Sequence, residues 1–575
     1  MRRVSVVFAA ALALLVGATG AAAITRSDVL VSNGSPPAPF SQNKQNEPTV
    51  AIDASNPSIV VAGSNDEIDE EACNAGDPTR CPFTAGVGVS GFYYSSDSGH
   101  SWTQPTYTGY SARNCLGPAT CTPTIGGSIG TLPWYYESGL VSDGDPALAF
   151  GPTPDSNGSF SWANGSRLYY ANLTSNFPGM STFNGFEAIG VSRTDNAAAA
   201  AAGDKNAWMR PVIASMQSST TFSDKEQVWA DNASSSPFFG NVYVCWANFK
   251  GNSVHASPAP LLVAVSADGG ATWTEHPISA AANNSNVNPM DGCTVRTDSR
   301  GNAYVFGVGT DSAVGHQPFE FMSVSSNGGH NWSAQAPVAG PVNQPGIVDS
   351  VLGRPTIDGI AGARSDLAPA PSVDIANGAP DGSGATDRIV MSYVSGTIDN
   401  IHVYFTESAD QGATWSSPRA IETGSSDRGY YSAPAISPDG QTVYVVYNAF
   451  TTPYRTNTTD PRTLVGVFLQ AAVGASGTGS FTEVHRGAPG DPRGSSQNNL
   501  VGEFLGDYVY AAATRTYGTA VWNDTRNAAD CPAVDAWRYS LRVGPALPRV
   551  APQQQCAPNF GNSDIFGFTT ATAKK

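Results

Sequence analysis

Carboxylate residues precede a recurring kind of short apolar run in this sequence. Seven such runs occur, and five of them start with a carboxylate; the residues at the seven starts are Glu47, Asp145, Glu226, Asp291, Arg354, Ala433 and Asp507. If these runs are the innermost strands of a ring of sheets, the carboxylates lie together at the mouth of a central channel. Like charges that close raise one another's pKa or bind a cation, and either outcome makes a site. The alternative is structural, with each carboxylate capping a strand end through backbone N–H groups.

The elements that would position these side chains recur along the chain. After a turn that contains Gly or Asn, each opening is followed by a second apolar and aromatic strand, for example at 241–246 and 442–447. The openings lie about 60 to 100 residues apart, as in repeated sheets. The 60 Gly and 41 Pro residues suit short strands joined by many turns. The pattern predicts an all-β propeller of seven four-stranded antiparallel blades, with six blades as the alternative.

An eight-residue turn pattern, Ser-x-Asp-x-Gly-x-x-Trp, occurs at 95–102, 266–273 and 408–415, and a fourth copy at 325–332 has Asn327 in place of Asp. The acidic side chain can accept backbone N–H groups inside the turn, and Gly supplies a positive φ. We interpret these residues as structural. Their third and eighth positions are Asp97 and Trp102, Asp268 and Trp273, Asn327 and Trp332, and Asp410 and Trp415.

The octet resembles the Asp-box, or BNR repeat, of the sialidase superfamily. That resemblance implies a sialidase-like β-propeller whose boxes lie at the blade periphery, far from the substrate. It also implies a glycan or glycoconjugate as partner. Because Asp-boxes also occur in propellers that are not sialidases, the resemblance speaks more to fold than to activity.

A sialidase-type site would hold the substrate carboxylate with arginines and use a tyrosine nucleophile activated by a glutamate, with an aspartate as general acid. The resemblance implies retaining exo-α-sialidase activity without a required cofactor. The residues that could fill these roles are Arg354, Arg428, Arg526, Tyr430, Glu503, Tyr508 and Asp66. Two other hypotheses remain open: a non-catalytic propeller that binds glycan or protein, and a glycosidase of other specificity that uses two ring carboxylates as acid and base.

An acidic loop at 65–71 carries enough oxygen ligands for a structural calcium ion, although it lacks EF-hand spacing. A solvated acidic loop is the alternative. The formal net charge of −17 argues against nucleic acid or an anionic membrane as partner.

The first residues read as a secretory leader at 1–23, with a charged start, an apolar run and small residues at its end. We expect a linker with a closing strand at 24–46, a single propeller domain at 47–575, and a secreted monomer without a membrane span.

Eight cysteines in an exported chain predict disulfides. Pairing of neighbours along the chain would join Cys73 to Cys81, Cys115 to Cys121, Cys245 to Cys293 and Cys531 to Cys556. The spacings do not suit a zinc site.

Overall fold

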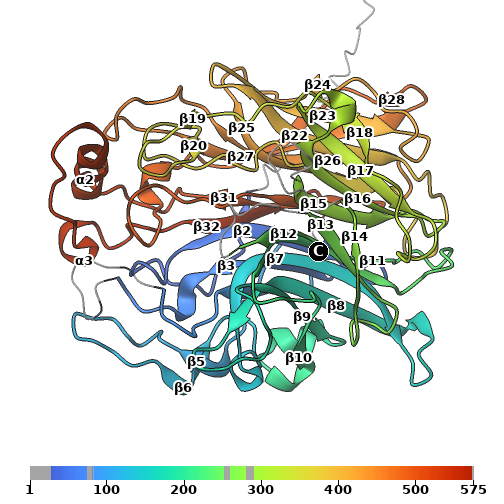
Figure 1. Ribbon diagram of the computed structural model, residues 1–575, viewed down its shortest axis with the longest axis horizontal. Coiled ribbons are helices and arrows are strands. Elements are labelled where there is room, and N and C mark those ends of the chain that lie inside the picture. The colour runs from blue at the N-terminus through green and yellow to red at the C-terminus, as the bar shows by residue number, and fades with distance from the viewer. Residues whose placement is uncertain are drawn as a thin grey trace, which may run out of the picture.

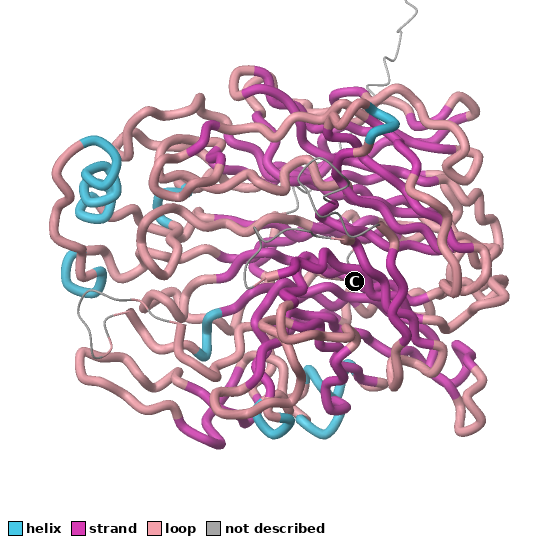
Figure 2. The backbone as a smooth tube through the Cα atoms, in the orientation of Figure 1, coloured by secondary structure: helices cyan, strands magenta, loops and turns pink. Residues whose placement is uncertain are grey.

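The computed structural model describes residues 27–73, 75, 81, 83–251, 260–279 and 290–572. The leader expected at 1–23 lies outside these residues. Most of the regular structure in the described part of the chain is β-strand (Figures 1 and 2).

The strands form seven antiparallel blades, which confirms the predicted fold class and blade number. Blade one holds β2 (Gln45–Ile52), β3 (Val60–Asp66) and β4 (Ser90–Ser95); blade two holds β7 (Leu140–Pro154), β8 (Phe160–Asn176), β9 (Ala188–Thr194) and β10 (Trp208–Ile213). Blade three holds β11 (Thr221–Ala230), β12 (Val242–Lys250), β13 (Leu261–Ser266) and β14 (Thr274–Pro277); blade four holds β15 (Met290–Thr297), β16 (Ala303–Thr310), β17 (Pro318–Ser325) and β18 (Ala336–Ala339).

The remaining blades complete the ring. Blade five holds β21 (Ser372–Ile375), β22 (Ile389–Thr397), β23 (Asn400–Ser408) and β24 (Arg419–Ala420); blade six holds β25 (Arg428–Ile436), β26 (Thr442–Phe450), β27 (Leu464–Gly474), β28 (Gly477–Thr478) and β29 (Thr482–Arg486). Blade seven holds β30 (Tyr510–Ala513), β31 (Gly518–Asp524), β32 (Asp564–Thr569) and β1 (Val29–Leu30). Each inner strand contacts the inner strand of the next blade, and β30 contacts β2. Because β1 pairs with β32, strands from both ends of the described chain share blade seven.

Blade five begins later than the sequence pattern suggested. Arg354 and Pro355 do not open its inner strand; they lie in a separate hairpin of β19 (Ile347–Val348) and β20 (Pro355–Thr356). The inner strand is β21, after an insertion. A short apolar run after Pro reads alike in both settings, so the pattern could not distinguish the hairpin from a blade.

Other insertions carry the remaining elements. They are the hairpin of β5 (Tyr107–Ser111) and β6 (Thr124–Ile129), the helices α1 (Ala197–Ala201), α2 (Pro532–Val543) and α3 (Pro552–Gln555), and the 3-10 turns η1 (Glu67–Asp69), η2 (Tyr136–Ser138), η3 (Lys205–Ala207), η4 (Ser312–Val314) and η5 (Pro492–Gly494). None of the helices in the described ranges has the length and apolar character needed to cross a bilayer.

The core lies between neighbouring blades, where apolar side chains from facing sheets pack together. Trp246 of β12 and Trp522 of β31 are fully buried there. Such aromatic side chains contribute much of the apolar area that stabilises stacked sheets.

The four octet turns adopt one geometry, and each follows the third strand of its blade. After β13, Ser266 Oγ donates to Asp268 Oδ1 (2.8 Å) and accepts the Gly270 N–H (2.8 Å). In the third copy the Asn327 amide oxygen accepts the Asn331 N–H (2.9 Å) in place of a carboxylate. These polar side chains are therefore occupied within their own turns.

Four disulfides join the cysteines as neighbours along the chain, at 73–81, 115–121, 245–293 and 531–556. The bond between Cys245 of β12 and Cys293 of β15 links blades three and four. Disulfides of this kind persist in oxidising compartments.

Candidate functional site

A repeated backbone irregularity marks one end of the central channel. The inner strands of five blades break register at the same place, within 46–49, 144–147, 224–227, 291–294 and 430–432. At each break one residue has a positive φ: Glu47 (57°), Asp145 (50°), Lys225 (59°), Gly292 (61°) and Tyr431 (51°). For residues other than Gly this conformation costs on the order of 1–3 kcal/mol and clusters at functional sites.

These bulges correct the predicted ring by one residue in blade three. Lys225, not Glu226, has the position equivalent to Glu47 and Asp145. Glu226 instead lines a smaller cavity of about 60 Å³ deeper along the channel. A bulge adds one residue to a strand, so a strict two-residue alternation assigns the neighbouring side chain to the wrong direction.

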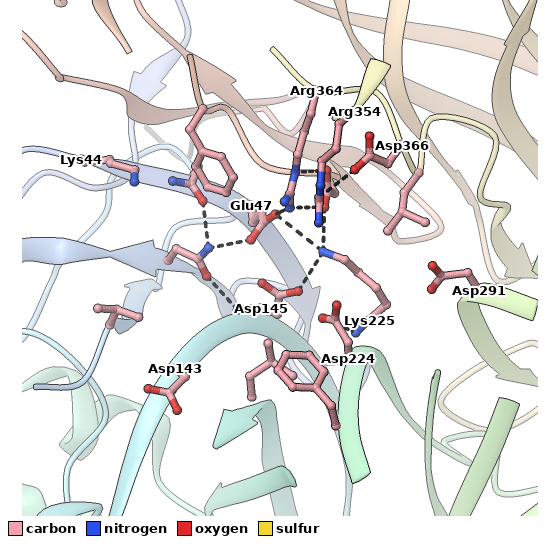
Figure 3. Close-up of a pocket in the computed structure, with 18 of the residues that line it drawn as sticks. Lys44, Glu47, Asp143, Asp145, Asp224, Lys225, Asp291, Arg354, Arg364 and Asp366 are labelled. Carbon is pink, nitrogen blue, oxygen red and sulfur yellow. Dashed lines mark hydrogen bonds and ion pairs between the residues drawn. The ribbon is translucent and has the colours of Figure 1, made fainter. Parts of the chain in front are cut away.

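Four of these five bulges contribute residues to the lining of a cavity of about 530 Å³ at the channel mouth. Four of the five predicted ring carboxylates line it: Glu47, Asp145, Asp291 and Asp507. Its cationic lining residues are Lys44, Lys225, Arg354 and Arg364. In Figure 3, Lys225 and Arg364 approach the carboxylates from different segments of the chain.

Lys225 connects its own blade, blade three, with residues of three other blades. Its Nζ lies 2.8 Å from Asp507 Oδ2, 3.0 Å from Asp145 Oδ2 and 3.8 Å from Glu47 Oε1. Burial alone would lower the pKa of this ammonium, but the carboxylates of Asp145 and Asp507 raise it well above its usual value. Lys225 therefore stays charged and fixes the geometry of the mouth.

Asp507 is held as a carboxylate. Arg364 donates from Nε to Oδ1 (3.0 Å) and also from Nη2 to Oδ2, and the Tyr431 hydroxyl donates to Oδ1 (2.8 Å). Burial opposes ionisation, but Arg364 and Lys225 outweigh it and lower the pKa of Asp507 strongly. With both oxygens bonded in this way, we assign Asp507 an anchoring role.

Glu47 and Asp145 form an unequal pair. Asn65 of β3 links them, since its Nδ2 donates to Glu47 Oε2 (2.6 Å) and its Oδ1 accepts the Asp145 N–H (2.7 Å). Burial and the Asp145 carboxylate raise the pKa of Glu47 well above its usual value. For Asp145 burial is outweighed by Lys225, which lowers the pKa. Glu47 is thus the protonated member of the pair and Asp145 the ionised one.

Two further carboxyl groups in the cavity lining have pKa values displaced toward neutrality. Burial raises the pKa of Asp291 to about 6 and that of Asp224 to about 7. Asp291 Oδ1 accepts the N–H of the adjacent Gly292 (2.8 Å), and its side chain remains partly exposed to the cavity. Asp291 is therefore ionised at neutral pH and open to a ligand.

The three arginines predicted to hold a substrate carboxylate do not converge. Arg354 lines the cavity and pairs with Asp366 (2.7 Å). Arg428 donates to the backbone oxygens of Thr452 (2.9 Å) and Ile357 (2.6 Å).

Arg526 has a structural environment in blade seven. It pairs with Asp28 (2.6 Å) and Asp524 (2.6 Å), and its guanidinium lies 3.8 Å from the centre of the Phe566 ring. Its charge is neutralised by Asp28 beside β1 and Asp524 at the end of β31. Neither Arg428 nor Arg526 lines the mouth cavity.

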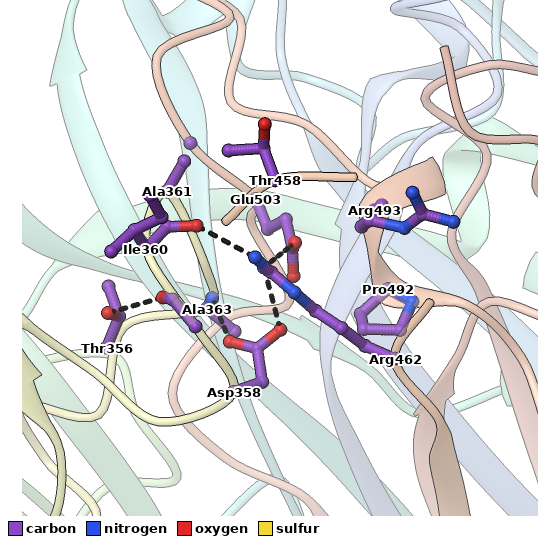
Figure 4. A network of polar contacts seen from close by, with 12 residues as sticks. Thr356, Asp358, Ile360, Ala361, Ala363, Thr458, Arg462, Pro492, Arg493 and Glu503 are labelled. Atoms are coloured by element: carbon purple, nitrogen blue, oxygen red, sulfur yellow. Dashed lines mark hydrogen bonds and ion pairs between the residues drawn. The ribbon is translucent and has the colours of Figure 1, made fainter. Parts of the chain in front are cut away.

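The other residues suggested by the resemblance are likewise outside the cavity lining. The Tyr430 hydroxyl donates to Gly506 O (2.9 Å), and Tyr508 lines the smaller channel cavity with its ring 5.7 Å from Lys225 Nζ. Glu503 bonds to Arg462 in a buried network (Figure 4). Asp66 accepts the Tyr93 hydroxyl (2.8 Å).

The acidic side chains of the 65–71 loop bond to neighbouring segments of the chain. Asp69 accepts from Arg113 (2.6 Å) and from the Thr131 hydroxyl (2.7 Å), and Glu67 pairs with Lys44 (3.0 Å). Within the described ranges, no group of three or more His, Cys, Asp or Glu side chains is placed to hold a metal ion.

The fold and this site define a seven-bladed β-propeller with an acidic, cation-bridged cavity at one channel mouth. No family model and no curated protein matches the sequence. One similar solved structure is the Hadza microbial sialidase Hz136, with 14% identity over 70% of this chain and 63% of that chain and a TM-score of 0.38. Two others are a leech intramolecular trans-sialidase, with 13% identity over 75% of this chain and 68% of that chain and a TM-score of 0.40, and an α-L-arabinofuranosidase from Fusarium graminearum, with 10% identity over 76% of this chain and 94% of that chain and a TM-score of 0.37. This chain therefore spans less than two thirds of the length of the Hadza sialidase. The seven blades confirm the predicted β-propeller fold.

Proposed function

We propose that this protein is a secreted glycoside hydrolase whose active site is the mouth cavity. The observation that carries the proposal is one cavity lined by a protonated carboxyl group, Glu47, and an ionised, partly exposed one, Asp291. Hydrolysis of a glycosidic bond needs such a pair, one group as acid and the other as base or nucleophile. The four disulfides and the leader expected at 1–23 support export.

Glu47 is the proposed general acid. Its Oε1 is buried and has no hydrogen-bond partner in the described part of the chain, and two cations face it, Lys225 Nζ at 3.8 Å and Arg364 Nη2 at 3.7 Å. In the proposed reaction a leaving-group oxygen that enters the cavity accepts the proton of this carboxyl group. Burial and the neighbouring carboxylate of Asp145 raise the pKa of Glu47 and so favour its protonated form. Transfer of the proton to the glycosidic oxygen leaves a second carboxylate in this pair, and Lys225 stabilises the resulting charge.

Asp291 is the proposed general base. It belongs to blade four, which lies across the seven-bladed ring from the blade of Glu47. A carboxyl pair on opposite walls leaves room for a sugar and an attacking water, the arrangement of inverting hydrolases. In that reaction the oxygen of the attacking water bonds to the anomeric carbon while the water gives a proton to Asp291. The bond from the anomeric carbon to the glycosidic oxygen breaks, and that oxygen takes the proton of Glu47.

The charge of the cavity favours a substrate without a carboxylate. The lining contains eight Asp and Glu side chains and four Lys and Arg side chains. The two lining arginines, Arg354 and Arg364, already pair with Asp366 and Asp507. A sialoside would have to displace those pairs against a surplus of carboxyl groups, so we propose neutral glycosides as substrates and rank exo-α-sialidase activity second.

A panel of fluorogenic glycosides tests the proposal. The purified protein and its Asp291→Asn variant would be assayed on 4-methylumbelliferyl hexosides, pentosides and a sialoside. The control is Asp381→Asn, because Asp381 is exposed and does not line the cavity. We expect turnover of a neutral glycoside that falls at least about 100-fold in Asp291→Asn and is unchanged in the control. Turnover of the sialoside alone would contradict the neutral substrate class. No turnover of any substrate would favour a non-catalytic glycan-binding propeller.

A further inference from the structure

A second cavity of about 510 Å³ adjoins the mouth cavity. The two cavities share the lining residues Lys44, Phe83 and Phe504. The second one is otherwise lined by polar side chains of the 497–499 segment, together with Cys81 and Arg549. Each volume is within the usual range of a small-ligand site, and together they exceed what one sugar unit needs.

The boundary between the cavities is built rigidly. Lys44 is buried and bonds to both Glu67 (3.0 Å) and Asn498 Oδ1 (3.0 Å), while Asn498 Nδ2 donates to Glu67 Oε2 (3.1 Å). Phe504 lies between two cations, with its ring centre 4.8 Å from Lys44 Nζ and 4.9 Å from the Arg364 guanidinium. This closed polar triangle and the fixed ring form a floor that does not need to rearrange for a ligand.

Phe83 is the anomalous residue of this region. Its side chain is 61% exposed, although it lies at the edge of a polar, charged cavity with its ring centre 5.9 Å from Lys44 Nζ. An exposed aromatic ring gains nothing from water, but its face can pack against the apolar C–H face of a pyranose or furanose while polar neighbours bond to the hydroxyl groups.

We infer that the second cavity is a subsite for the next sugar unit, so that the protein takes oligosaccharides rather than isolated terminal sugars. The chain of a neutral glycan would cross the floor of Lys44 and Phe504 and stack one unit on Phe83. This inference rests on the proposed function for the identity of the ligand. It concerns binding, which can be measured whether or not hydrolysis follows.

Calorimetric titration tests the inference. Xylotriose, cellotriose, maltotriose and arabinotriose, each beside its monosaccharide, would be titrated into the wild-type protein and into Phe83→Ala. The control is Ile125→Ala, because Ile125 of β6 is a similarly exposed apolar residue (67%) outside both cavity linings. We expect at least one trisaccharide to bind about tenfold more tightly than its monosaccharide, and Phe83→Ala alone to remove this gain.

The outcomes separate the two proposals. Trisaccharide binding that depends on Phe83 but is never followed by hydrolysis supports the subsite and contradicts the proposed hydrolase. Hydrolysis with no advantage for trisaccharides, or with an advantage that Phe83→Ala leaves intact, overturns the subsite. Failure of all four trisaccharides to bind overturns it as well.

Discussion

A Glu47→Gln variant is expected to lose about 10²- to 10⁴-fold in kcat/KM on an unactivated glycoside. The amide keeps the size of the side chain but has no acidic proton for the leaving oxygen. The loss should shrink on aryl glycosides with acidic leaving groups, because those leave with little protonation. The measurement is kcat/KM for wild type and variant across a series of leaving groups on one sugar.

Glu226→Gln is the matched control for Glu47→Gln. Glu226 is the same residue type on an inner strand, is 5% exposed, and has a pKa raised well above its usual value by burial and Asp145. Glu226 lines the smaller channel cavity and not the mouth cavity. The kcat/KM of the Glu226→Gln variant should therefore stay at the wild-type level. If Glu47→Gln loses the same factor in kcat/KM on activated and on unactivated substrates, Glu47 is not the general acid.

Replacement of Arg462 by Met is expected to lower the free energy of unfolding by about 3–5 kcal/mol. Arg462 is 1% exposed in its side chain and pairs with Asp358 (3.2 Å) and Glu503, which are equally buried (Figure 4). Its Nη2 also donates to the Ile360 carbonyl (2.9 Å). Methionine fills much of the volume but leaves two buried acidic groups without their cation. Equilibrium denaturation measures the change.

Arg300→Met is the control for this measurement. Arg300 also pairs with an aspartate, Asp387 (3.2 Å), but its side chain is 62% exposed, so we expect a loss of about 1 kcal/mol or less. If both variants lose the same small amount, the buried network is not a stabilising element.

The backbone plan was predictable from local chemistry. Turn residues of the octets and alternating apolar runs specify strands and their order, and both depend on near neighbours in the chain. The same holds for the disulfides, where each bond joins cysteines adjacent in order, such as Cys531 and Cys556. Four carboxylates of the mouth could be found in this way, since each directly precedes an apolar run of an inner strand in the sequence.

The chemistry at the mouth depends on features that the pattern does not encode. Lys225 occupies a bulge position. A bulge shifts by one residue which side chains face the cavity, and it leaves no clear signal in the sequence. Arg364 comes from the insertion before blade five and reaches Asp507, 143 positions further along the chain. Residues such as Arg526 matched the expected type but find partners elsewhere in the fold. Their roles are set by tertiary contacts.

The pH dependence of kcat/KM on a neutral glycoside tests the central claim most directly, since it reports the ionisation of the free enzyme. The account requires Asp291 ionised and Glu47 protonated. Because burial raises the pKa of Asp291 to about 6, activity should be low in acid, rise as the pH passes about 6, and remain high through neutrality while Glu47 keeps its proton. Asp291→Asn should lose this acidic limb together with most of the activity. A wild-type profile that is highest below pH 5 and declines toward neutrality would contradict the assignment of both groups.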